Sequence, residues 1–104
     1  MLPVLLLHGA LGSRSQLHPL KFALRARGLE VYSMDFSGHG GIPFDHTFGI
    51  ETFSGDVVRH LEKEGLERVH IFGYSMGGYV AVWLAHQHTQ RVGKIVTLGT
   101  KFDW

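Results

Sequence analysis

The sequence predicts an α/β protein, with a parallel sheet and helices on both of its faces. Strand-like apolar stretches alternate with segments whose apolar residues recur at helical spacing. The first stretch, residues 3–7, has no alternating polar residues, which is typical of a strand buried on both faces. Glycine-rich turns follow this stretch and the one that ends at Tyr74. Such turns mark the places where parallel strands pass into helices.

Strands and helices are expected to alternate along the whole chain. The strands are expected at residues 3–8, 30–35, 69–74 and 94–99, and the helices at 16–27, 50–64 and 76–88. Core-facing positions of the first two helices are expected at Leu17, Leu20, Leu24, Phe53, Val57 and Leu61. Gly28 and Gly65 follow these helices, and glycine commonly ends a helix.

Composition limits the function classes. The chain has 104 residues, of which 44% are hydrophobic, and a net charge of +1, as in an ordinary globular domain. No basic block indicates a nucleic-acid partner. The absence of cysteine excludes disulfides and a thiol nucleophile, and we expect a cytoplasmic location. The apolar start is far shorter than the roughly 20 residues of a membrane span, and it lacks the basic start of a signal peptide.

The segment Gly73-Tyr74-Ser75-Met76-Gly77-Gly78 directly follows an apolar run and precedes an apolar helical stripe. This is the G-x-S-x-G pattern of a nucleophile elbow, in which a sharp strand-to-helix turn exposes a serine above the sheet. Residues two before and two after the serine must be small because side chains there would collide. Alternatively, Ser75 merely caps the helix, and Gly77-Gly78 lets the helix pack closely on a strand. The helix start favours negative charge on a bound oxygen.

A second glycine loop, His8-Gly9-Ala10-Leu11-Gly12-Ser13, follows the first apolar run. Its glycines allow the backbone to approach a ligand closely. The N–H groups of Ala10 and Met76 are therefore predicted to form an oxyanion hole. We find no metal-ligand spacing and expect neither a metal nor a cofactor.

These segments, together with residues 35–40 (DFSGHG), resemble the N-terminal portion of the α/β-hydrolase fold. The motifs occur in the order and rough spacing of that family and extend over the whole chain. The resemblance implies that Ser75 is the nucleophile, that Ala10 and Met76 form the oxyanion hole, and that Tyr74 adjoins the pocket. It also implies that His8 supports the loop and that the second, first, third and fourth strands lie side by side in this order.

The family places its catalytic acid and histidine late in the chain. We therefore expect these 104 residues to be part of a single, longer hydrolase domain, with the histidine beyond Trp104. Within the chain, Asp103 is a candidate acid, and His39 in the Gly-His-Gly turn is the best substitute base. Phe44, Phe48 and Phe53 line either an acyl pocket or the core. If the fourth strand lacks a further neighbour, its apolar edge favours self-association.

The leading expectation is a serine hydrolase that forms an acyl-enzyme with an ester, a thioester or a related small acyl substrate. A lyase or acyl-transfer member of the same fold, or a catalytically silent binding fragment, remains an alternative. A dinucleotide-binding module fits poorly because Ser75 occupies the position where the G-x-G-x-x-G pattern needs its second glycine.

Overall fold

A four-stranded parallel sheet forms the centre of the molecule. The computed structural model describes residues 2–9, 12–36 and 49–100. The strands β1 (Val4–Leu7), β2 (Val31–Met34), β3 (Val69–Tyr74) and β4 (Val92–Leu98) lie in the order β2-β1-β3-β4. All neighbouring strands are parallel. The predicted fold class and strand order are therefore confirmed.

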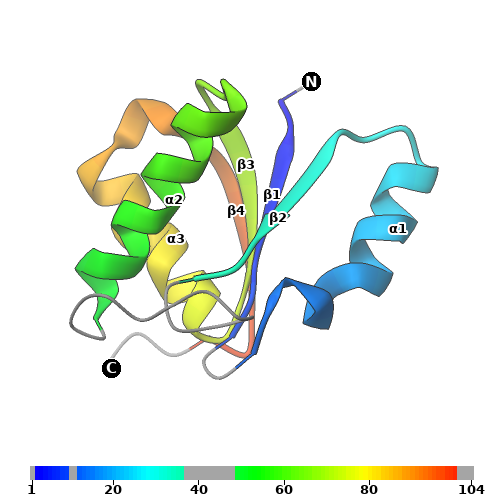
Figure 1. The fold of residues 1–104 in the computed structure, drawn as a ribbon, viewed down its shortest axis with the longest axis horizontal. Helices are drawn as coiled ribbons and strands as arrows, with labels where there is room; N and C mark the ends of the chain where they lie inside the picture. Colours follow the sequence, from blue (N-terminus) through cyan, green and yellow to red (C-terminus); the bar gives the residue numbers. More distant parts are fainter. Residues whose placement is uncertain (1, 10–11, 37–48, 101–104) are drawn as a thin grey trace.

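The helices cover both faces of the sheet. The helix α1 (His18–Ala26), preceded by the short 3₁₀ turn η1 (Arg14–Leu17), lies on one side, and α2 (Ile50–Glu64) and α3 (Met76–Gln87) lie on the other (Figure 1). A second 3₁₀ turn, η2 (Thr89–Arg91), leads from α3 into β4. The arrangement agrees with the right-handed connections expected between parallel strands.

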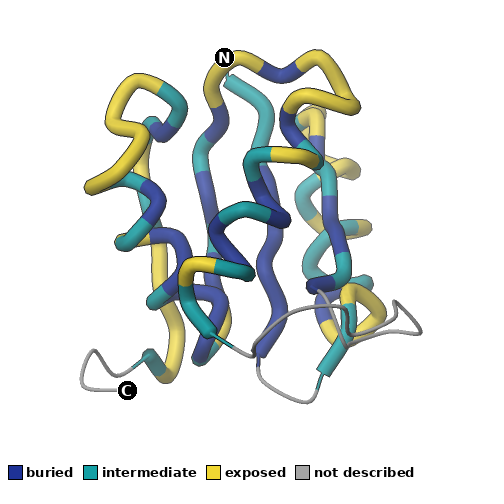
Figure 2. Tube along the Cα trace, turned by 60° about the vertical axis from the view of Figure 1, so that its left-hand side comes forward, coloured by how far each residue is buried: buried dark blue, intermediate teal, exposed yellow. Residues whose placement is uncertain are grey.

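The central strand β1 explains the unbroken apolar run near the start of the chain. Leu5, Leu6 and Leu7 are all fully buried. Leu5 and Leu7 belong to the large core that faces α2 and α3, whereas Leu6 belongs to a smaller core beneath α1. Figure 2 shows the buried residues following the sheet and the inner sides of the helices. Because both faces are covered at these three positions, they leave no place for a polar side chain.

The predicted core positions of the helices are more deeply buried in α2 than in α1, on the opposite face of the sheet. Phe53, Val57 and Leu61 of α2 are buried as expected. On the other side, Leu17 is buried in η1, while Leu20 and Leu24 of α1 are only partly buried. The helix α1 also begins later than predicted, at His18, because η1 occupies the preceding turn and Pro19 stands in the first turn.

The strand β4 begins at Val92 rather than at the predicted residue 94. The ladder between β3 and β4 has an irregularity between the pairs Val69–Val92 and Ile71–Ile95, and β4 runs through Gly93. The Lys94 N–H donates to Nδ1 of His70 at 2.8 Å. A side-chain acceptor thus replaces a backbone one, and the strand continues through the glycine.

Candidate active site at the strand-to-helix elbow

The turn from β3 into α3 has the geometry of a nucleophile elbow. Ser75 lies between the two elements with φ 54° and ψ −115°, and it is the one non-glycine residue in the described part of the chain with positive φ. L-residues other than glycine rarely adopt this conformation, because Cβ meets the neighbouring backbone. Such strain persists only where the surroundings hold it, and it is common at functional sites.

The Ser75 side chain does not cap α3. Ser75 occupies the N-cap position, yet its side chain makes no capping hydrogen bond. Serine at this position normally bonds to an N–H of the first turn. The interpretation of Ser75 as a simple helix cap is therefore wrong. Ser75 thus stands at the N-terminal, positive end of α3.

Missing side chains make the elbow possible. A Cβ on Gly73 would overlap the backbone of Gly77 and Gly78, which return across it at the start of α3. A Cβ on Gly77 would overlap the carbonyl oxygen of Leu7, at the end of β1. The glycines around Ser75 therefore serve close backbone packing, as the motif requires. This packing also brings the elbow against the end of β1.

The loop after β1 is a direct neighbour of Ser75. A Cβ on Gly9 would lie 3.3 Å from Cβ of Ser75 and 3.1 Å from the Tyr74 ring. The two glycine motifs, far apart in the sequence, therefore meet at the carboxyl ends of β1 and β3, where ligands of open α/β sheets bind. Met76 begins α3 and is buried. Ala10 lies outside the described residues, so its predicted role in an oxyanion hole stays a prediction.

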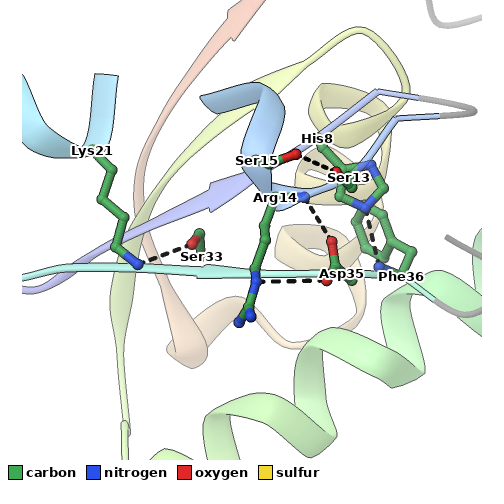
Figure 3. Close-up of polar contacts among 8 residues, drawn as sticks. All are labelled: His8, Ser13, Arg14, Ser15, Lys21, Ser33, Asp35 and Phe36. Carbon is green, nitrogen blue, oxygen red and sulfur yellow. Dashed lines mark hydrogen bonds and ion pairs between the residues drawn. The ribbon is translucent and has the colours of Figure 1, made fainter. Parts of the chain in front are cut away.

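His8 braces this loop through both ring nitrogens. It is fully buried, with Nδ1 placed 2.7 Å from the Gly9 carbonyl oxygen and Nε2 accepting from the Phe36 N–H at 3.1 Å. Figure 3 shows the imidazole directed at Phe36, beyond the end of β2. A neutral ring with its proton on Nδ1 satisfies both contacts. Because both nitrogens are engaged, His8 is a poor proton acceptor for Ser75. These contacts agree with the supporting role that the resemblance implies, and that role stays a prediction.

Two further hydrogen bonds near this loop, made by the side chains of Gln16 and Asp35, were not predicted from the sequence. The Gln16 side chain accepts from the Gly9 N–H at 3.3 Å. Asp35 accepts from the Arg14 N–H at 2.6 Å, and its other oxygen lies 3.6 Å from Nε of Arg14 (Figure 3). Asp35 thus holds the start of η1. No local pattern could have revealed these contacts, because they join residues of different elements.

The remaining candidates are only partly placed by the structure. His39, Asp103, Phe44 and Phe48 lie outside the described residues. Phe53 is a core residue, packed against Phe36 with ring centroids 5.2 Å apart. No group of three potential metal ligands occurs among the described residues. In the same part of the chain, no helix is long and apolar enough to cross a membrane.

The fold is that of the α/β-hydrolase family. The family described as alpha/beta hydrolase fold matches residues 3–104, and the chain belongs to it. A diacylglycerol lipase of Xenopus tropicalis, sn-1-specific diacylglycerol lipase ABHD11, is 34% identical over 97 residues, which cover 92% of this chain and 30% of that protein. The chain thus spans about a third of the length of this relative.

Other relatives share the fold with different chemistry. Ethanol acetyltransferase 1 of Kluyveromyces marxianus is 33% identical over 90 residues, which cover 86% of this chain and 25% of that protein. Among solved structures, Est816, described as an N-acyl homoserine lactone degrading enzyme, matches with a TM-score of 0.89 and 27% identity over 96% of this chain and 39% of its own. The proteins similar to this chain in sequence or structure therefore include lipases, esterases and acyltransferases.

Proposed function

We propose that this chain carries the nucleophile and the oxyanion hole of a serine hydrolase that acts on an ester, a thioester or a related carbonyl compound. The observation that carries the proposal is Ser75 itself. This residue stands in strained backbone geometry at the head of α3, and its side chain makes no capping hydrogen bond. A serine that only caps a helix does not need strained backbone geometry. In a nucleophile elbow, the strain exposes the serine hydroxyl beside fixed N–H donors.

In the proposed reaction, Oγ of Ser75 attacks the carbonyl carbon while a base removes the hydroxyl proton. The N–H groups of Met76 and Ala10 stabilise the charge that develops on the carbonyl oxygen. Removing one donor from an oxyanion hole costs about 3 kcal/mol of transition-state stabilisation in enzymes of this kind. The alcohol or thiol then leaves with a proton, and water hydrolyses the acyl-enzyme.

We propose that the base acts from outside the described residues, because the ring nitrogens of His8 are both engaged. Within the chain, His39 is the candidate substitute base, and Asp103 is the candidate acid that would orient a base. A soluble base can replace a missing one, provided that the serine is already placed for attack. Imidazole is therefore a suitable substitute in a test of this chain.

The proposal is tested by intact-mass labelling of the folded chain with a fluorophosphonate, at increasing imidazole concentrations. We expect one label per chain, at a rate that rises with imidazole, and no label on the Ser75→Ala variant. Ser54→Ala is a matched control, since Ser54 is a buried serine in α2. A folded chain that stays unlabelled at every imidazole concentration, or that is labelled in Ser75→Ala, would contradict the proposal.

Acyl transfer to an alcohol is a second candidate, favoured by the match to the acetyltransferase of Kluyveromyces marxianus. The two functions share the acyl-enzyme and differ in what attacks it. Labelling Ser75 with an activated acetyl ester and following deacylation with and without ethanol separates them. Faster deacylation with ethyl acetate as the product supports transfer, whereas deacylation that ethanol does not accelerate supports hydrolysis.

A further inference from the structure

The backbone of Ser75 is held from the end of β4. Its N–H donates to the carbonyl oxygen of Leu98 at 2.8 Å. Its carbonyl oxygen accepts from the Thr100 hydroxyl at 2.9 Å and from the Gly78 N–H at 3.1 Å. Both backbone polar groups of Ser75 are thus bonded, while the side chain takes no part in helix capping.

Thr100 reaches the elbow because the chain turns sharply after β4. Gly99 has φ 63°, a left-handed conformation that glycine adopts without a steric penalty. The Thr100 side chain then lies against the first turn of α3, where a Cβ on Gly78 would overlap its hydroxyl oxygen. The hydroxyl therefore fills the space that the absent side chain of Gly78 leaves.

The carbonyl of Ser75 needs such a partner for a geometric reason. In a strained turn, a small rotation of the peptide between Ser75 and Met76 redirects the N–H of Met76 relative to the serine side chain. Strained conformations persist only when several contacts hold them. Of the partners of Ser75, Leu98 and Gly78 act through their backbones, whereas Thr100 acts through a side chain that substitution can change.

We propose that Thr100 is a positioning residue, which fixes the Ser75 peptide so that the serine hydroxyl and the Met76 N–H face the same point. This inference rests on the proposed function of Ser75. Thr100 acts through Ser75, and no contact with substrate is required. Its hydroxyl should therefore affect the reactivity of the serine more than the affinity for a ligand.

Three variants separate the hydroxyl from the shape of the side chain. Thr100→Val keeps the shape and removes the hydroxyl, and Thr100→Ser keeps the hydroxyl. Thr97→Val is the matched control, because its methyl group also lies beside Gly78. The readout is saturable fluorophosphonate labelling of Ser75 in imidazole, which yields a maximal rate and a half-saturating concentration. Circular dichroism establishes that each variant is folded.

We expect Thr100→Val to lower the maximal labelling rate about 5- to 10-fold, the factor that one neutral hydrogen bond supplies, with an unchanged half-saturating concentration. Thr100→Ser should restore most of the rate, and Thr97→Val should match the parent. A folded Thr100→Val that is labelled at the parent rate, or a Thr100→Ser that is as slow as Thr100→Val, overturns the inference. Should Thr100→Val not fold, Thr100→Ser and Thr100→Ala are compared in the same way.

A second readout keeps this inference separate from the proposed function. Carbon chemical shifts of Ser75 report its backbone conformation and the hydrogen bonds of its carbonyl, without any labelling. We expect these shifts to move in Thr100→Val and to return in Thr100→Ser. If the parent chain is not labelled but the shifts behave in this way, the proposed function fails while Thr100 still positions the elbow. Shifts that do not change in Thr100→Val contradict the positioning role.

Discussion

Gly77 lies where the first turn of α3 crosses the end of β1. At this point the backbones of two elements touch without any side chain between them, since a Cβ would meet the carbonyl oxygens of Leu7 and His8. The same contact presses the elbow against the loop that begins at His8. The position of the serine relative to that loop thus depends on the absence of a single methyl group.

Gly77→Ala should lower the free energy of unfolding by about 1–3 kcal/mol, because the added methyl has no space and the backbone must move. Gly55→Ala is the matched control in α2, where the new Cβ would lie 3.4 Å from the Arg59 side chain, an ordinary contact. Alanine there should leave stability unchanged or raise it by about 0.5–1 kcal/mol. Urea unfolding measures both, and equal stability of the two variants would show that the contact at Gly77 is unimportant.

Among the elements, β4 differs from the other strands in its exposure. In the described part of the chain it pairs with β3 alone. Ile95 packs towards α2 and α3, whereas Val96 and Leu98 are 60% and 58% exposed. Exposed apolar edges of this kind favour association between sheets.

We expect the chain to self-associate with rising concentration, and Val96→Lys to shift it towards the monomer. A charge on an edge strand opposes pairing with a second sheet. Val82→Lys, at a residue of α3 that is 41% exposed, is the control and should not change the association. Size-exclusion chromatography with light scattering measures the mass. A parent chain that stays monomeric at all concentrations would refute the prediction.

The elements and the elbow were predictable because their causes are local. Unbroken apolar runs mark β1, and small residues around Ser75 mark the turn. The contacts that hold the site were not predictable, since they join residues that no local pattern connects. His8 and Phe36 are 28 residues apart, and Thr100 and Ser75 are 25 apart. The start of β4 was predicted two residues too late. There the Lys94 N–H donates to the His70 side chain instead of to a backbone carbonyl, and no local pattern indicates this contact.

The stability of the whole molecule should depend on the protonation of His60 in α2. Burial lowers the pKa of His60 below its ordinary value of 6.5, opposed by Glu64 and assisted by Lys63 and Arg14. Its Nε2 is buried and has no hydrogen-bond partner among the residues that the structure describes. The folded chain thus holds the imidazole neutral, whereas the unfolded chain binds a proton more readily.

Because the folded pKa is lowered, the contribution of His60 to stability is fully present above pH 6.5 and is lost as the pH falls towards the folded pKa. His60→Gln should therefore lose less stability than the parent between pH 7.5 and pH 5, in urea unfolding curves. His88→Gln is the control, at an exposed histidine. Parallel loss of stability in the parent and in His60→Gln would exclude this role.

The strand order also bears on how the chain folds during synthesis. Strand β1 precedes both of its neighbours along the chain, and β2 and β3 are made later, with Leu7 paired to Met34 and to Gly73. At about 5–20 residues per second, the ribosome needs roughly 3 to 13 s to pass from Leu7 to Gly73. During that interval the leucines of β1, fully buried in the final fold, have no completed sheet to cover them. The chain is therefore expected to depend on chaperones most strongly in the time before β3 emerges.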